Sequence, residues 1–183
     1  PSSMTLALEA LGWNRLFPGN SVNRRYRYVG RNWDKEGEVE QPAGAFLAFR
    51  RALWRQLGGF DERFRPVWFE DVDFCLRARQ TGAMIYYLPI VTARHAGGDS
   101  VQRMPWECHV VAWYVSLLKY ASKHFRPPGR RGVGVAVAVG SVFRALIFTA
   151  RRRSIRPVAV YAKVYRLGVQ SVFSGTVEGG QQR

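Results

Sequence analysis

Residues 68–75 read WFEDVDFC in one-letter code and place three carboxylates, Glu70, Asp71 and Asp73, inside an aromatic and apolar run. A carboxylate in such surroundings is costly to bury unless it is paired, bound to a metal or used in chemistry. The residue types therefore allow three roles. The acids could cap a helix, hold a divalent cation or act as a general base.

The first role is structural. Residues 70–80 have helical periodicity, and Asp73 and Arg77 stand one helical turn apart as an i,i+4 pair. Acids favour the first turn of a helix, where free N–H groups and the helix dipole stabilise negative charge. On spacing alone, this capping role is favoured for Glu70 and Asp71.

The second role would make Asp71 and Asp73 an Asp-x-Asp clamp for the metal of a nucleotide diphosphate. Residues two apart on a helix point to different sides, so the two carboxylates converge poorly on one ion. The spacing disfavours this role.

The third role is a general base at the mouth of a pocket, where a carboxylate accepts the proton of a hydroxyl. Trp68, Phe69 and Tyr86 or Tyr87 could then stack on sugar rings, although aromatic residues in such runs more often belong to the core. His95 follows Asp71 by 24 positions, but a lone histidine is more often structural than a ligand.

Several elements must position these residues. Hydrophobic periodicity and glycine stops predict helices at residues 3–11, 51–57, 70–80 and about 106–124. Compact apolar runs predict a buried strand at 43–49 and further strands at 84–88 and 91–93. Residues 16–40 are polar and predict an irregular loop, and residues 96–100 a tight one.

A longer run carries a family resemblance. The sequence QPAGAFLAFRRALWRQLGGFDERFRPVWFEDVDFCLRARQTGAMIYYLP, followed by RHAGGDSV, resembles the C-terminal half of the catalytic domain of glycosyltransferase family two. It is most similar to the rhamnosyltransferase-like and galactofuranosyltransferase-like members. The resemblance is strong over residues 41–100 and extends over about 6–124. It implies an α/β fold, a partial GT-A-like (Rossmann-like) sheet with packed helices, over residues 1–124.

The resemblance also implies roles for individual residues. The second acid of the Glu-Asp pair is the family's base, so Asp71 would deprotonate the acceptor and Glu70 would position acceptor or base. His95 matches the histidine that helps hold the divalent metal, Mg or Mn. The remaining matches are substrate contacts: Gly44 and Ala45 near the donor sugar, Asp61 and Glu62 in the GGFDE turn near the acceptor, and Asp73 as a polar contact beside the base. Trp68 and Phe69 stay candidates for stacking on the acceptor.

The implied activity is inverting transfer of a sugar from a nucleotide-sugar donor to a glycan or lipid-linked acceptor, in cell-envelope polysaccharide synthesis. The family's N-terminal half carries the nucleotide-binding βαβ units and its own Asp-x-Asp metal motif, and the sequence contains neither. We therefore expect a piece of a longer transferase, with little activity by itself because positioning of both substrates supplies much of the rate.

The charge distribution concerns the C-terminal part. Of the net +15, residues 1–107 contribute 15 Lys and Arg against 12 Asp and Glu, whereas residues 108–183 contribute 13 against Glu178 alone. Residues 125–183 are expected to form a basic, apolar helical extension at the cytoplasmic face of the cell membrane, attached peripherally or as a C-terminal anchor. For residues 132–150, a helix in the plane of an anionic membrane surface is favoured over one that spans the bilayer and over an ordinary core helix with solvated arginines. The alternative is a non-catalytic basic module that binds membrane or nucleic acid. Nucleic acid is disfavoured because the cations alternate with Val, Ala and Leu instead of aromatic residues.

Overall fold

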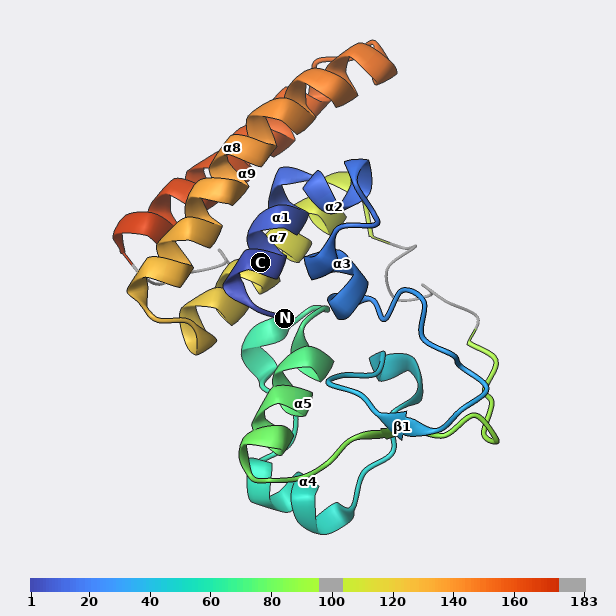
Figure 1. The fold of residues 1–183 in the computed structure, drawn as a ribbon. Helices are drawn as coiled ribbons and strands as arrows, with labels where there is room; N and C mark the ends of the chain where they lie inside the picture. Colours follow the sequence, from blue (N-terminus) through green and yellow to red (C-terminus); the bar gives the residue numbers. More distant parts are fainter. Residues whose placement is uncertain (96–103, 175–183) are drawn as a thin grey trace. The chain divides into compact units, whose positions relative to one another are not determined.

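The computed structural model describes residues 1–95 and 104–174. The chain divides into two compact units: a helical unit, made of residues 1–30 and 105–183, and a carboxylate unit, made of residues 31–104 (Figure 1). The helical unit is therefore discontinuous in sequence. The carboxylate unit contains every residue singled out above as a candidate for catalysis or binding, and each unit is described separately.

The helical unit is built from six helices in the described part of the chain. They are α1 (Ser3–Leu11), α2 (Trp13–Leu16), α3 (Ser21–Tyr26), α7 (Trp106–His124), α8 (Pro127–Arg152) and α9 (Arg156–Phe173). Ser2 begins α1 with a reciprocal capping box to Thr5, and Gly12 ends it in the left-handed conformation. The predicted helices at 3–11 and about 106–124 are thus confirmed.

The helices of this unit pack around apolar residues that repeat at helical spacing. The buried side chains include Leu6 and Ala10 of α1, Leu117, Leu118 and Tyr120 of α7, Val133 and Val137 of α8, and Val164 of α9. Helices α8 and α9 run side by side as a hairpin joined at Arg153 to Ile155 (Figure 1). Side-chain burial of this kind supplies most of the stability of an amphipathic helix.

The α8–α9 contact depends on small residues. A Cβ at Gly168 of α9 would lie 2.8 Å from both the amide nitrogen of Ala138 and the carbonyl oxygen of Gly134 on α8. A Cβ at Gly134 would in turn lie 2.9 Å from the Gly168 oxygen. The two backbones therefore approach more closely than any larger side chain at these positions would permit.

The carboxylate unit contains two helices and one minimal sheet. Its described elements are β1 (Gly37–Glu38), η1 (Gly44–Phe46), α4 (Arg51–Leu57), η2 (Glu62–Phe64), α5 (Glu70–Gln80) and β2 (Tyr86–Tyr87). The strands pair antiparallel, with Gly37 opposite Tyr87 and Glu38 opposite Tyr86. The predicted helices at 51–57 and 70–80 are confirmed.

The strand predictions fail for most of their length. Residues 43–49 form the short turn η1 and extended chain, and Gly44, Ala45 and Phe46 are exposed instead of buried. Of residues 84–88 only two pair, and residues 91–93 form no strand. A strand needs a hydrogen-bonded neighbour, and in the described part of this unit only β1 and β2 provide one for each other. The described chain is consequently mostly helical, in contrast to the predicted α/β sheet.

The predicted irregular loop at 16–40 is also partly wrong. It contains α3 and β1. Asn20 caps α3 by accepting a hydrogen bond from the Asn23 amide at 2.9 Å, and the Asn23 side chain donates to the Pro18 carbonyl at 2.7 Å. The polar residues that predicted a loop here include asparagines that stabilise a short helix. The Asn20 side chain does so by accepting a hydrogen bond from a free N–H group in the first turn of α3. The predicted loop at 96–100 lies outside the described residues.

Candidate active site

The three carboxylates lie in the first turn of α5, which begins after an unusual backbone segment. Trp68 and Phe69 both have φ of +71°, in the left-handed region that side chains other than glycine seldom adopt. Each such residue costs on the order of 1–3 kcal/mol, and the cost is tolerated only where the surroundings fix the conformation. Phe69 is buried, with 7% of its surface exposed, and so helps to hold the chain in this form.

Asp71 connects α5 to the turn η1. Its Oδ2 atom accepts a hydrogen bond from the backbone N–H of Gly44 at 2.7 Å, and its Oδ1 atom accepts one from the N–H of Val72 at 2.8 Å. The fit is close, because a Cβ at Gly44 would lie 3.0 Å from both Cβ and Oδ2 of Asp71. The structure thus brings together Asp71 and Gly44, which are 27 residues apart in sequence.

Glu70 differs from Asp71 in its surroundings. Burial raises the pKa of the Glu70 carboxyl above its ordinary value, a hydrogen bond from its own backbone opposes this shift, and the neighbouring charge of Asp71 adds to it. The Oε2 atom is buried and accepts no hydrogen bond from the described residues. Adjacent acids therefore differ in character: Glu70 holds its proton more readily than an ordinary glutamate, and Asp71 is fixed by backbone amides.

Asp73 is fully buried in an ion pair. Its Oδ2 atom accepts a hydrogen bond from Nε of Arg77 at 2.7 Å, and the side chain has no exposed surface. Arg77 also donates to the carbonyl oxygens of Leu57 and Gly59, both at 2.7 Å. Arg77 therefore fastens α5 to the end of α4 and to the glycine turn after it. The sequence predicted the Asp73–Arg77 pair but gave no sign of these two backbone contacts.

An aromatic cluster supports the same helix. Phe49 stacks on Trp54 with ring centroids 5.1 Å apart, and Phe60 and Phe74 pack against both rings. Phe74 belongs to α5 and is almost fully buried. The sequence analysis did not single out this cluster, whose members come from three segments that only the folded chain brings together.

The remaining predicted residues lie around this site in different environments. Asp61 starts η2 and binds Arg63, whose Nη2 atom lies 2.6 Å from Oδ2. Glu62 is exposed and pairs with Arg65 at 3.1 Å. Ala45 is exposed in η1, and Trp68 is half-buried. These placements fix Asp61 as part of a turn, while Ala45 and Glu62 are accessible to a ligand.

The metal prediction rests on His95, which is exposed. The described residues bring together no group of three or more His, Cys, Asp or Glu side chains that could hold a metal ion. Mg²⁺ and Mn²⁺ prefer several oxygen ligands, so one imidazole is a poor fit for either. The part of the chain that the structure describes does not form a complete metal centre, and the role of His95 stays a prediction.

Comparison with known proteins identifies the class. Residues 27–114, which include every residue discussed in this section, match the family model described as glycosyltransferase-like family 2. The matched part of the chain is a glycosyltransferase family 2-like domain. This membership implies a partial GT-A fold, of which the described carboxylate unit has only a two-stranded sheet.

The similar curated proteins come from two strains of Mycobacterium tuberculosis. Each is named N-acetylglucosaminyl-diphospho-decaprenol L-rhamnosyltransferase and is 31% identical to this chain over 147 residues. The match covers 78% of this chain and 47% of the relative, so the chain spans about half the length of these curated relatives. No solved structure matches the chain.

Proposed function

We propose that the protein transfers a sugar from a nucleotide-sugar donor to a glycan or lipid-linked acceptor, with Asp71 as the general base. The observation that carries this proposal is the Asp71 carboxylate, fixed by the Gly44 N–H at 2.7 Å in the first turn of α5. A base needs a defined position more than it needs a shifted pKa. Family membership supports the reaction class.

In the proposed step, Asp71 accepts the proton of an acceptor hydroxyl while the hydroxyl oxygen attacks the anomeric carbon. The bond from that carbon to the diphosphate breaks on the opposite face, and the electron pair leaves with the nucleoside diphosphate. Displacement of this kind inverts the anomeric carbon. Glu70, which retains its proton more readily than usual, would donate a hydrogen bond that orients the acceptor.

The donor site requires more than the described residues supply. We infer that the nucleotide-binding half of the transferase lies outside this chain, which is consistent with a match to only 47% of each relative. A divalent cation, Mg²⁺ or Mn²⁺, is common in GT-A enzymes, and here its ligands would have to come largely from that other half. By itself the chain is expected to have little activity, because it would hold one substrate without the other.

The name of the relatives supports a proposal for the acceptor class. It describes transfer of a rhamnosyl group to N-acetylglucosaminyl-diphospho-decaprenol. We propose a lipid-linked saccharide acceptor of the same general kind, used in cell-envelope polysaccharide synthesis at the cytoplasmic face of the cell membrane. The basic C-terminal helices are consistent with such a location.

The substitution Asp71→Asn tests the base. The open reading frame that contains this chain, extended upstream of Pro1, would be assayed for sugar transfer with nucleotide sugars, Mn²⁺ and membrane lipid extract. We expect the variant to lose at least about a hundredfold in turnover, the usual contribution of a general base. Donor binding should persist.

The variant keeps the side-chain shape, and the asparagine Oδ1 atom can still accept the Gly44 hydrogen bond, but the bond from the Val72 N–H is given up. Circular dichroism would verify that the variant is folded. Asp34→Asn is the matched control: Asp34 is an exposed acid of the same unit, and its replacement should leave turnover unchanged. Full activity of Asp71→Asn would remove Asp71 as the base. Sugar transfer by the 183-residue chain alone would instead contradict the inference of a missing half.

A further inference from the structure

Between positions 132 and 150, the outward side of α8 carries no polar side chain. Between positions 132 and 150, the residues that the structure classes as exposed recur at intervals of three and four and so lie on one face of the helix. This apolar face consists of Gly132, Val135, Val139, Val142, Phe143, Leu146, Ile147 and Ala150. Phe143 and Leu146 are 56% and 64% exposed, so the face is a real apolar surface of the helical unit.

The opposite side of α8 is occupied. Val133 and Val137 are fully buried, and Gly134 lies against α9. Near the middle of α8, Arg144 donates hydrogen bonds to the carbonyl oxygens of Glu9 and Ala10 at the end of α1. Among the described residues, these contacts leave one side of α8 uncovered and available to a partner.

The cations beside this face favour a negatively charged partner. No Asp or Glu occurs between Glu107 and Glu178, whereas cations surround the hairpin turn and line the exposed side of α9. The exposed cations are Arg151, Arg152, Arg153, Arg156, Lys163 and Arg166. A second copy of the chain would bring two such basic surfaces together, which repulsion opposes. An anionic lipid surface offers both apolar depth and phosphate charge.

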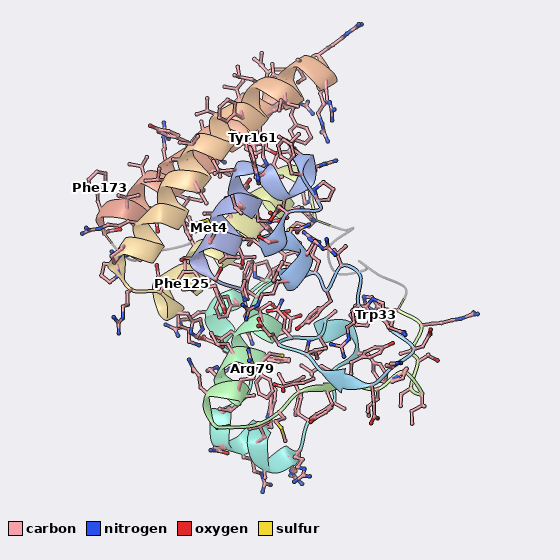
Figure 2. All side chains as sticks on the ribbon, in the orientation of Figure 1. Met4, Trp33, Arg79, Phe125, Tyr161 and Phe173 are labelled. Carbon is pink, nitrogen blue, oxygen red and sulfur yellow. The ribbon has the colours of Figure 1, made fainter. Side chains whose placement is uncertain are left out.

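Helix α9 also carries exposed apolar side chains. Val158 and Tyr165 are 48% and 45% exposed, and Phe173, at the end of α9, is 82% exposed (Figure 2). At the turn, the guanidinium of Arg152 lies 4.3 Å from the centroid of the Trp106 ring, which anchors the turn to α7. The hairpin is thus held in place by its own unit and presents both apolar groups and cations outward.

We propose that the α8–α9 hairpin lies in the plane of an anionic phospholipid membrane, with the apolar face of α8 in the boundary between headgroups and acyl chains. The exposed arginines beside the turn and the cations of α9 contact the lipid phosphates. Membrane binding by this surface does not depend on the proposed sugar transfer.

The contacts of α8 favour this arrangement over a transmembrane one. By length and composition alone α8 could cross a bilayer, but 39% of its most apolar 18-residue window is buried inside the protein. Helix α1 is hydrogen-bonded to α8 through Arg144, and its Glu9 side chain accepts hydrogen bonds from Asn14 and Arg27 at 3.0 Å. If α8 crossed the membrane, it would carry the attached Glu9, Asn14 and Arg27 side chains into the hydrocarbon layer, which is strongly unfavourable.

Vesicle flotation of the whole 183-residue chain tests binding. We expect at least about tenfold more protein bound to vesicles of phosphatidylcholine with phosphatidylglycerol than to phosphatidylcholine alone, with the difference falling as salt rises. Equal binding to both vesicle types, or none to either, would overturn the proposal. So would retention of the chain on DNA in preference to the anionic vesicles.

Two variants locate the surface. Leu146→Glu with Ile147→Glu should reduce binding at least about tenfold, and Arg151→Gln with Arg156→Gln and Arg166→Gln should abolish the preference for anionic vesicles. Leu16→Glu is the matched control: Leu16 is 72% exposed in the same unit but lies outside the hairpin. Circular dichroism would verify that each variant keeps its helices. Folded variants that bind like the unchanged chain would refute the assigned surface.

A depth measurement separates the two orientations. Single cysteines at positions 135, 139, 143 and 146, placed in a background with Cys75→Ala and Cys108→Ser, would be labelled with a fluorophore. Lipids brominated at different depths would then quench the labels. An in-plane helix gives one shallow depth for all four positions. A progressive change of depth along α8 would instead mean that the helix crosses the membrane, and it would overturn the proposal.

Discussion

Arg77 is the residue that makes a buried carboxylate tolerable in α5. Asp73 has no exposed surface, and the Arg77 side chain is 17% exposed, so the pair lies in a region that water scarcely reaches. The same guanidinium satisfies the carbonyl oxygens of Leu57 and Gly59. Removing one partner of such a pair leaves an uncompensated charge, which costs far more than the pair contributes.

We therefore expect Arg77→Met to lower the free energy of unfolding by about 3–5 kcal/mol. Denaturation by urea, followed by tryptophan fluorescence, would measure the change. Arg65→Met is the matched control, because Arg65 pairs with Glu62 at the surface, where an ion pair contributes less than about 1 kcal/mol. Similar losses for the two variants would contradict the role assigned to Arg77.

Glu70 gives a prediction about pH. Burial raises its pKa in the folded protein above the ordinary value of 4.5, so folding favours the protonated form. The stability linked to this group is present below pH 4.5 and is lost as pH rises through the folded pKa. We expect Glu70→Gln to gain stability relative to the unchanged protein as pH rises from about 4.5, and to show no gain in more acidic solution.

Urea denaturation at a series of pH values would measure this difference. Glu62→Gln is the control, because Glu62 is exposed and pairs only with Arg65 among the contacts described above. A stability difference between Glu70→Gln and the unchanged protein that stays constant with pH would mean that the Glu70 pKa is not raised.

The three acids of WFEDVDFC show which structural details the residue types alone do not determine. Their pattern predicted a helix start, and α5 does begin at Glu70. The pattern also predicted the Asp73–Arg77 pair, but not the burial of that pair. Nor did it predict that Asp71 would bind Gly44 or that Glu70 would have a buried oxygen. Those differences arise from groups 20 or more positions away, such as Leu57 and Gly44, which a local pattern cannot place.

At the scale of elements, the α8–α9 hairpin depends on two glycines. Gly168→Ala would place a methyl group 2.8 Å from backbone atoms of α8, which can yield only if the helices separate. We expect a loss of about 1–3 kcal/mol in the free energy of unfolding, the typical cost of overpacking. Thermal unfolding followed by circular dichroism at the helix band would measure it.

Gly132→Ala is the matched control on α8. Gly132 is exposed, and a Cβ there meets nothing within 4 Å. Alanine should therefore raise stability by up to about 1 kcal/mol through its better helix propensity. If Gly168→Ala proved as stabilising as Gly132→Ala, the close approach of α8 and α9 would be refuted.

The helix predictions were confirmed and most strand predictions were wrong for one physical reason. The helices at 3–11, 51–57, 70–80 and 106–124 were predictable because their hydrogen bonds and stop signals are local, as with Gly12 and Gly58. The apolar run at 43–49 was a plausible strand, yet a strand forms only beside a partner that may lie anywhere in the chain. In the described chain this run finds no partner, and Gly44 turns toward Asp71.

At the scale of the whole molecule, the chain is organised as one continuous unit inserted into a discontinuous one. Residues 1–30 join the C-terminal helices through buried contacts such as Leu6 and through the hydrogen bonds from Arg144 to the end of α1. The predicted domain boundary at residue 124, with 125–183 as a separate domain, stays a prediction. The two compact units described here are defined by which residues pack together, and this is a different criterion.

The sequence by itself determined the family, the main helices, the acids at the start of α5 and the basic, acid-free C-terminal part, because each is written in residue types at short spacing. The tertiary structure alone decided which acid is fixed by a backbone amide, which is buried with arginine, and which side of α8 stays uncovered. These outcomes depend on contacts between distant segments, such as Asp71 with Gly44 and Arg144 with Ala10, and such contacts form only once the chain has folded.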